Sequence, residues 1–319
     1  MSLMMNRMIV PIVACAIAFQ VGGADPELTA PGAQLEKLAG DFSFTEGPAA
    51  DAQGNVFFTD QPNDRILKWS IEGKLDTYLQ PCGRANGLTF DREGNLWACA
   101  DEKNELWRIS PDGRKTVVLK EYEGKLFNGP NDIWICYRAD AASGASADAA
   151  AGERQSVARV YFTDPYYKRP YWSRGPKELP ETVYLLEPGS GRVRRVIDDL
   201  KQPNGIIGTP DGKTLYVADI GAKKTYRYRI ARDGSLEGKK LFCELGSDGM
   251  TIDEDGNVYL TGKGVTVFSP EGRQIAQIDV PEPWTANVCF GGVDRRTLFI
   301  TASKSLYSIR MRVRGVDSQ

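Results

Sequence analysis

Six oxygen-bearing side chains recur along the chain at similar spacings, and four of them are followed directly by glycine. They are Glu46, Asn86, Asn131, Asn204, Asp248 and Asn287, separated by 40, 45, 73, 44 and 39 residues. Any one of them alone would indicate no more than a turn, because Asn, Asp and Gly are common turn residues. Two carboxylates and four carboxamides in register instead favour a site for a hard divalent cation such as Ca²⁺ or Mg²⁺.

The absence of histidine narrows the chemistry further. None of the 319 residues is histidine, which excludes Ser-His-Asp and Cys-His catalysis and His-ligated zinc, iron or copper sites. The chemistry must therefore use carboxylates, amides, Lys, Tyr, Cys or an oxygen-bound metal. The 40 Lys and Arg against 42 Asp and Glu leave a net charge of −2, which gives no reason to expect a nucleic acid or an anionic membrane as partner.

A repeat of about 40 residues would position these side chains. Each unit contains the recurring polar residue, a short apolar strand, a Gly-centred turn such as Glu93-Gly94 or Asp211-Gly212, an apolar-aromatic strand and two further strands. The apolar-aromatic strands are expected at 56–59, 96–99, 160–163, 215–218, 258–261 and 298–301. We predict an all-β fold, a six-bladed β-propeller of four-stranded antiparallel blades, with no amphipathic helix.

The last repeat supplies only three strands, at about 287–291, 297–302 and 305–310. The N-terminal segment around Leu35–Leu38 is the expected donor of the fourth, which closes the ring without an open edge. We predict that residues 25–319 form a single propeller domain. Because equivalent positions of the innermost strands lie at one face of a propeller, the six recurring residues should form a ring there.

The third repeat is about thirty residues longer than its neighbours. One part of the surplus, 138–156, is rich in Ala, Ser and Gly and is expected to be a surface loop. The other part, 166–180, combines Tyr and Trp with Lys and Arg. This aromatic-basic loop has two interpretations, a lid over a polar ligand or a loop that packs its rings on the blade edge.

Residues 1–24 are typical of a secretory signal peptide, with Arg7 before an apolar stretch at 8–19 and small residues at 22–24. The stretch is too short to span a bilayer, so we expect a periplasmic or secreted protein. Lipid anchoring at Cys15 and a cytoplasmic N-terminus remain alternatives. Without Cys15, the number of cysteines is odd and no Cys-x-x-Cys occurs, so we predict no full disulfide framework and no catalytic cysteine.

Several motifs, kept in order, resemble the regucalcin/gluconolactonase family of six-bladed lactonases over about residues 34–310. They are Phe-Thr-Glu-Gly-Pro at 44–48, Asn-Gly-Pro-Asn-Asp at 128–132, Tyr-Phe-Thr-Asp-Pro at 161–165, Gln-Pro-Asn-Gly at 202–205 and Ser-Asp-Gly-Met at 247–250. The ordered set is specific, although no single motif decides the matter. The gluconolactonase branch is the most similar.

The resemblance implies a role for each matched residue. Glu46, Asn204 and Asp248 would bind one divalent cation, with Ca²⁺ preferred and Mg²⁺, Mn²⁺ or Zn²⁺ as alternatives. Asp248 would also be the catalytic base, and Asn131 would orient substrate or water beside the metal. Asn86 matches a substrate-binding position.

Asp132 needs its own interpretation, and two segments of this chain depart from the family pattern. Asp132 follows Asn131 directly and should therefore point to the opposite side, where a structural role is expected. The segment 100–104 and the pair Leu126-Phe127 depart from the pattern of gluconolactonases at expected substrate contacts. The resemblance therefore supports the metal site more strongly than the sugar site.

These observations favour a secreted, metal-dependent hydrolase that opens a small-molecule sugar lactone, in which the ion polarises the carbonyl and activates water for a carboxylate base. The alternative is a non-catalytic propeller that binds a protein or carbohydrate partner, but such a protein would not need two carboxylates at matched positions. Hydrolysis of phosphoesters or aryl esters is less favoured, since relatives with that activity often add a histidine.

Overall fold

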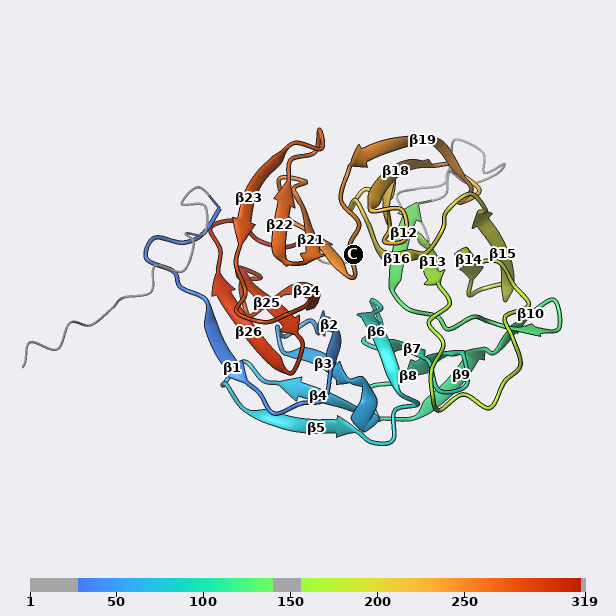
Figure 1. Ribbon diagram of the computed structural model, residues 1–319, viewed down its shortest axis with the longest axis horizontal. Coiled ribbons are helices and arrows are strands. Elements are labelled where there is room, and N and C mark those ends of the chain that lie inside the picture. Colours follow the sequence, from blue (N-terminus) through green and yellow to red (C-terminus); the bar gives the residue numbers. More distant parts are fainter. Residues whose placement is uncertain (1–27, 140–155, 317–319) are drawn as a thin grey trace, which may run out of the picture.

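Six four-stranded antiparallel sheets surround a central channel in the computed structural model, which describes residues 28–139 and 156–316 (Figure 1). The first blade consists of β2 (Thr45–Ala50), β3 (Val56–Asp60), β4 (Arg65–Trp69) and β5 (Leu75–Leu79). The second consists of β6 (Ala85–Phe90), β7 (Leu96–Ala100), β8 (Glu105–Ile109) and β9 (Lys115–Leu119). The third consists of β12 (Ile133–Ala139), β13 (Ser156–Asp164), β14 (Thr182–Glu187) and β15 (Arg192–Ile197).

The other three blades repeat the same order from the channel outward. The fourth blade consists of β16 (Pro203–Gly208), β17 (Thr214–Asp219), β18 (Lys224–Ile230) and β19 (Leu236–Cys243). The fifth consists of β20 (Met250–Ile252), β21 (Val258–Gly262), β22 (Gly264–Phe268) and β23 (Gln274–Ile278). The sixth consists of β24 (Thr285–Gly291), β25 (Thr297–Ala302), β26 (Ser305–Arg310) and β1 (Glu36–Ala39). The six-bladed prediction is confirmed, and each apolar-aromatic strand lies where the sequence predicts it.

The N-terminal strand β1 completes the last blade, as predicted. It pairs antiparallel with β26, with Glu36 opposite Ser308, and the two lie side by side in Figure 1. The contact extends before β1, because Thr29 and Met311 form a β-bridge. The start of the described chain is therefore held in the last blade, whereas its end reaches the fifth blade, where Gly315 forms a β-bridge with Asp253.

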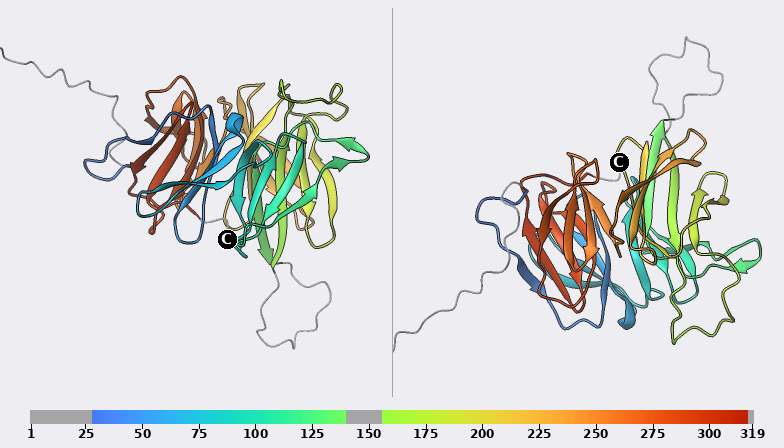
Figure 2. Two further views of the ribbon diagram at one scale, coloured as in Figure 1. Left: turned by 90° about the horizontal axis from the view of Figure 1, so that it is seen from below. Right: turned by 45° about the horizontal axis from the view of Figure 1, so that its top comes forward.

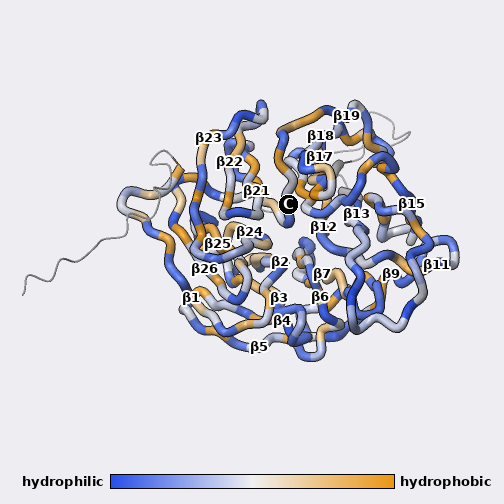
Figure 3. The backbone as a smooth tube through the Cα atoms, viewed as in Figure 1, coloured by the Kyte–Doolittle hydropathy of each residue, from blue (hydrophilic) through white to orange (hydrophobic). Residues whose placement is uncertain are grey.

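The core lies between neighbouring blades rather than in the channel. Second-strand side chains such as Phe58, Phe162 and Tyr259 are fully buried, and each hydrophobic cluster joins residues of adjacent sheets, as Phe58 of β3 and Phe299 of β25 do. Figure 3 shows the hydrophobic stretches within the strands and hydrophilic turns between them. Burial of these alternating side chains is what fixes the register of the blades.

Among the described residues, the only helical segment is a 3₁₀ turn, η1 (Gln61–Asn63), and none is long and apolar enough to cross a membrane. A small hairpin of β10 (Glu121–Tyr122) and β11 (Lys125–Leu126) lies outside the blades. Seen from the side, the strands run between the two faces of the disc (Figure 2). The predicted signal peptide and most of the loop at 138–156 lie outside the described residues.

The five cysteines of the described chain are all buried: Cys82, Cys99, Cys136, Cys243 and Cys289. Cys82, Cys99, Cys243 and Cys289 are free thiols, which agrees with the prediction of no full disulfide framework. Burial raises the pKa of the Cys82 and Cys289 thiols to about 12, which keeps them protonated and unreactive at neutral pH.

Candidate active site

The recurring polar residues do form a ring where the inner strands begin, and β-bulges help to turn them toward the channel. In four inner strands the pairing register shifts at or next to the ring residue, between Glu46 and Ala49, Ala85 and Leu88, Pro203 and Ile206, and Thr285 and Asn287. A bulge re-aims the side chains around it. Five of the six residues are at most 6% exposed, and Asp248 is half-buried.

The glycines that follow four ring residues allow the inner strands to approach one another. A Cβ atom on Gly47, whose φ is +45°, would lie 2.1 Å from the backbone oxygen of Asn86. A Cβ on Gly249 would lie 1.8 Å from Cγ of Asn287. The ring residue of the next blade therefore packs directly against each glycine, which brings residues from different repeats into contact.

Asn204 and Asp248 are joined directly, and two further residues hold them. Nδ2 of Asn204 donates to Oδ1 of Asp248 at 2.8 Å and to the hydroxyl of Tyr167 at 2.9 Å. Nε1 of Trp284 donates to the other carboxylate oxygen of Asp248 at 2.6 Å. Both side chains are thus fixed in orientation, with the amide oxygen of Asn204 directed away from its hydrogen-bond partners.

That amide oxygen identifies where a cation would fit. Oδ1 of Asn204 and Oδ1 of Asn86 are buried and have no hydrogen-bond partner among the described residues. A buried oxygen without a partner carries a desolvation cost that coordination of a cation would offset. Within the described chain no group of three or more His, Cys, Asp or Glu forms a metal site, but the predicted set has only two carboxylates, and its third donor is this amide.

Glu46 lies on the other side of the ring and is linked to a third carboxylate. Nδ2 of Asn287 lies 3.4 Å from Oε2 of Glu46 and 3.0 Å from Oδ1 of Asp132. The backbone N–H of Gly47 also donates to Oε2 of Glu46. The ring therefore carries three carboxylates rather than the two that its sequence register indicates.

The three carboxylates repel one another in a buried setting. Burial raises the pKa of Glu46 well above its usual range, and the charges of Asp248 and Asp132 raise it further. Burial raises the pKa of Asp248 to about 6, against the effect of hydrogen bonds from Trp284 and Asn204. A divalent cation among these oxygens would relieve this repulsion.

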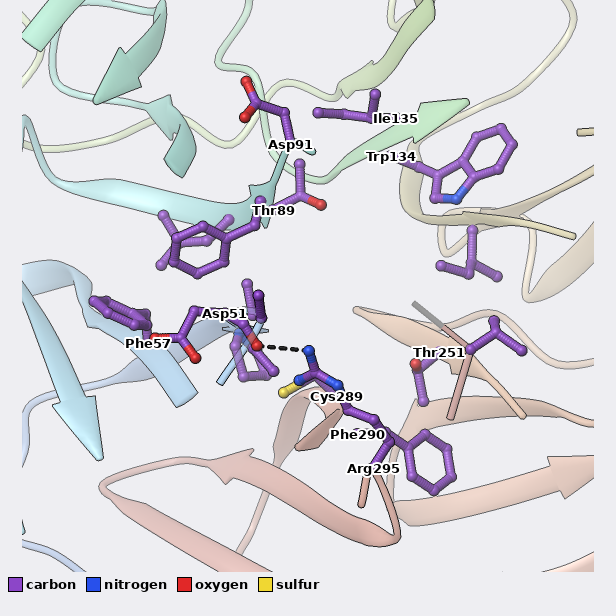
Figure 4. Close-up of a pocket in the computed structure, with 18 of the residues that line it drawn as sticks. Asp51, Phe57, Thr89, Asp91, Trp134, Ile135, Thr251, Cys289, Phe290 and Arg295 are labelled. Carbon is purple, nitrogen blue, oxygen red and sulfur yellow. Dashed lines mark hydrogen bonds between the residues drawn. The ribbon is translucent and has the colours of Figure 1, made fainter. Parts of the chain in front are cut away.

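Asp132 occupies a boundary position between the two ends of the channel. It lines a cavity of about 1160 Å³ at the end away from the ring, with Asn287 beside it. Figure 4 shows aromatic walls in this cavity, including Phe57 and Trp134, and the hydrogen bond from Arg295 to Asp51 at its rim. Asp132 therefore lies against both the cavity and, through Asn287, the ring, and its charge acts on Glu46. Its structural role stays a prediction.

The two proposed substrate residues also lie in the ring. Asn86 and Asn131 are each 4% exposed, and the backbone N–H of Gly87 donates to the backbone oxygen of Asn131 at 2.8 Å. This bond joins the second and third blades at the channel mouth. The structure thus brings all the predicted site residues to one face, while their individual roles stay predictions.

A set of buried aspartates supports the loops that lead into the ring. Asp60 accepts the backbone N–H groups of 43 and 44, Asp164 those of 128 and 129, and Asp219 those of 201 and 202. Each aspartate ends the second strand of its blade and holds the segment just before a ring residue. This interaction explains why an acidic residue recurs at that position of the repeat.

The aromatic-basic loop at 166–180 follows one of its two predicted interpretations, packing on a blade, while its role as a lid stays a prediction. Tyr166 and Trp172 pack against each other with ring centroids 5.8 Å apart, and Nε1 of Trp172 donates to the backbone oxygen of Asp101 at 2.8 Å. The loop therefore packs on the second blade. Through Tyr167 it also reaches Asn204 in the ring.

Sequence reasoning missed three residues of this site, namely Tyr167, Trp284 and Asp101. All three lie in connecting loops and have no counterpart in the other repeats. The only sequence signal was indirect, because 166–180 is unusually aromatic and 100–104 departs from the family pattern.

Comparisons with known proteins agree with the six-bladed fold. The profile of the family described as SMP-30/Gluconolactonase/LRE-like region matches residues 44–304. A gluconolactonase of Zymomonas mobilis is 28% identical over 313 residues, covering 88% of this chain and 82% of that protein. A pentonolactonase of Haloferax volcanii is 29% identical over 262 residues, covering 76% and 79%.

Solved structures are similar over nearly the whole described chain. A gluconolactonase of Xanthomonas campestris has a TM-score of 0.76 and 27% identity, covering 89% of this chain and 91% of that one. Regucalcin of Agrobacterium tumefaciens, described as a calcium-binding protein, has a TM-score of 0.67, 18% identity and coverage of 88% and 94%. The second likeness shows the fold alone.

Proposed function

The chain belongs to the SMP-30/gluconolactonase/LRE-like family, and from that membership we propose that it is a divalent-metal-dependent lactonase that hydrolyses sugar-acid lactones. Gluconolactonase and pentonolactonase are the names of relatives that match more than three quarters of this chain. Both names describe carboxylic ester hydrolases that act on sugar lactones. An enzyme is therefore favoured over a propeller that only binds a protein or carbohydrate partner.

The orientation of the Asn204 amide is the observation that supports this proposal most directly. Its nitrogen is used by Asp248 and Tyr167, and its buried oxygen has no partner among the described residues. Oxygen ligands from amides and carboxylates are those that Ca²⁺ and Mg²⁺ prefer. We assign Asn204, Glu46 and Asp248 as the residues that would hold the cation.

A bound cation supplies Lewis-acid polarisation of the lactone carbonyl. Asp248 acts as the base that takes a proton from the attacking water, and Trp284 and Asn204 keep its carboxylate in a fixed orientation. The oxygen of the water forms a bond to the carbonyl carbon and the bond to the ring oxygen breaks. That ring oxygen takes the proton from Asp248 and leaves as a hydroxyl. One water is consumed, and the aldonic acid is released.

Asn131 and Asn86 contribute amide groups to the same mouth. Each is buried in the ring, where an amide N–H can donate to a substrate hydroxyl or to the developing oxyanion. Preorganised donors of this kind need no reorganisation when charge develops on the substrate. The site can therefore carry out lactone hydrolysis without histidine.

Lactone hydrolysis in a weakly buffered solution with a pH indicator tests the proposal. We expect the purified protein to release protons from glucono-1,5-lactone faster than the spontaneous reaction, to lose this activity with a chelator, and to regain it with Ca²⁺. A panel of five- and six-membered sugar lactones would define the preferred ring. Activity that persists after complete removal of divalent ions would contradict the metal requirement.

We also propose that the protein acts outside the cytoplasm, on the basis of the composition of residues 1–24. The expected mature chain begins near Asp25, ahead of the first described residue of the structure. Mass spectrometry of the protein from cell fractions would test this, since a processed chain in the periplasm or medium is expected. An unprocessed cytoplasmic chain would contradict it, and a lipidated Cys15 would support the anchored alternative.

A further inference from the structure

Asp101 is the centre of a polar cluster beside the ring that the proposed reaction does not use. Its Oδ2 atom accepts hydrogen bonds from Nε of Arg169 at 2.8 Å, the hydroxyl of Tyr171 at 2.7 Å and Nε2 of Gln61 at 3.1 Å. The residue is 2% exposed. Three donors on one buried oxygen fix the Asp101 carboxylate of the second blade against the aromatic-basic loop.

The second blade departs from the repeat to provide this carboxylate. In three other blades the aspartate that ends the second strand holds the loop before the ring residue, but the matching position here is Ala100. Asp64 of the first blade performs that task instead and accepts the N–H groups of Cys82 and Arg84. Asp101, one residue beyond Ala100, is therefore free to bind Arg169.

Arg169 lies between Asp101 and the ring with part of its hydrogen-bonding capacity unused. Its guanidinium lies over the ring of Tyr167, 5.4 Å from the centroid, and the hydroxyl of Tyr167 is bonded to Asn204. Only Nε has an acceptor within the described chain, and the side chain is 25% exposed.

The charge balance determines what this arginine can recognise. Asp101 cancels the charge of Arg169, while Glu46, Asp132 and Asp248 together carry −3 when ionised. A dication in the ring would still leave a negative site. A substrate with its own anionic group is therefore disfavoured there, whereas hydroxyl and ring oxygens can accept from the two terminal guanidinium nitrogens.

We propose that Arg169, held and neutralised by Asp101, is a specificity-determining residue that binds the oxygens of uncharged, polyhydroxylated lactones and that Asp101 excludes lactones carrying phosphate or sulfonate. This inference rests on the proposed lactonase function for the identity of the substrate. The geometry also makes a prediction that does not require turnover. Substitution of the two partners should shift the charge preference in opposite directions.

The test compares kcat/KM for glucono-1,5-lactone and for its 6-phosphate in the parent, Asp101→Asn and Arg169→Gln. Asp101→Asn keeps an oxygen acceptor but exposes the charge of Arg169, so the ratio for phosphorylated over uncharged lactone should rise about tenfold, the effect of one charge at about 8 Å and an effective dielectric of about 30. Arg169→Gln should lower that ratio and raise KM for the uncharged lactone with little change in kcat.

Two controls separate recognition from structure. The double variant Asp101→Asn/Arg169→Gln should lose the gain of Asp101→Asn, because no unpaired cation remains. Lys177→Gln removes an equal charge from the same loop, where Lys177 pairs with Glu181 at 2.6 Å, and should leave the ratio unchanged. If Asp101→Asn does not fold, Arg169→Gln alone tests the role of Arg169, through its KM for the uncharged lactone and its ratio of kcat/KM for the phosphorylated over the uncharged lactone.

Binding of unreactive analogues keeps this inference distinct from the proposed function. Calorimetry with 1,5-anhydroglucitol and its 6-phosphate measures the same preference without hydrolysis. A parent protein that opens no lactone, but whose variants shift analogue preference as described, would refute the activity and retain the role of Arg169. An unchanged ratio in both single variants would overturn the role of Arg169, whatever the activity.

Discussion

Asn204 on the fourth blade and Asp248 leading into the fifth share a 2.8 Å hydrogen bond at the channel mouth. The bond uses the amide N–H of Asn204 and so fixes its oxygen toward the ring. Neighbouring repeats thus determine each other's orientation, and neither side chain can turn without the other.

Asp248→Asn should separate catalysis from metal binding. The variant keeps an oxygen of nearly the same shape but cannot accept a proton, and loss of a general base costs about 10²- to 10⁴-fold in rate. Lactone hydrolysis should be measured across a Ca²⁺ titration beside Asn204→Ala, whose loss should be largely restored by saturating metal. If the hydrolysis rate of Asp248→Asn recovers fully at high Ca²⁺ concentration, Asp248 is not the base, and Glu46 is the next candidate.

Glu46→Gln should weaken Ca²⁺ binding, because it removes one of the charges that face the cation. Calorimetry should show a higher Kd than in the parent, while the melting temperature without metal should be unchanged or higher, since a buried carboxylate repelled by Asp132 and Asp248 is removed. Equal affinity in the parent, in this variant and in Asp248→Asn would show that the metal site is misplaced.

Tyr167→Phe should weaken metal binding without touching a ligand. The hydroxyl accepts from Nδ2 of Asn204 at 2.9 Å, and loss of such a supporting hydrogen bond typically costs 10- to 100-fold in affinity. Tyr166→Phe is the matched control, because it removes a hydroxyl from the adjacent position of the loop. Calorimetry that finds the two variants alike would remove Tyr167 from the metal site.

The free energy of unfolding should depend on pH through Asp164. Burial raises its pKa in the folded protein to about 7, above the value of about 4 in an unfolded chain. The folded state therefore binds the proton more tightly, and this contribution to stability is present at pH 4 and lost as the pH rises to about 7. Urea denaturation at pH 5 and pH 8 should show a smaller difference for Asp164→Asn than for the parent.

Removal of residues 25–40 should destabilise the whole ring, because it deletes β1 and exposes the edge of β26. Thermal unfolding should occur at a clearly lower temperature than in the parent. A chain that lacks only residues 1–24 is the control and should melt like the parent. A long truncation with an unchanged melting curve would contradict closure by β1.

Much of this architecture follows from local patterns that repeat. Turn glycines and short strands such as 56–59 and 298–301 predict the blades, and the same register predicts the ring from Glu46 to Asn287. Repetition makes each weak signal reliable, because a position that recurs six times in a closed ring must lie at the same height in every blade.

The supports of the site could not be predicted in this way. Tyr167, Trp284 and Asp101 come from loops of individual blades, where side-chain direction depends on packing rather than on strand alternation. The third ring carboxylate was missed for a related reason. Strand alternation predicts Asp132 on the side away from Asn131, but Asn287 bridges it to Glu46 across blades that are distant in sequence.

The pairing of β1 with β26 also has a consequence for how the chain is made. Glu36 meets Ser308, 272 residues later, so β1 must wait for the last strand of the ring before it can pair. Because the loop between these strands is so long, its closure adds an entropic cost to the free-energy barrier of folding. Until the last blade is synthesised, both edges of the growing stack stay unpaired and open to other chains. Chaperone dependence during synthesis should therefore end only with the final strand.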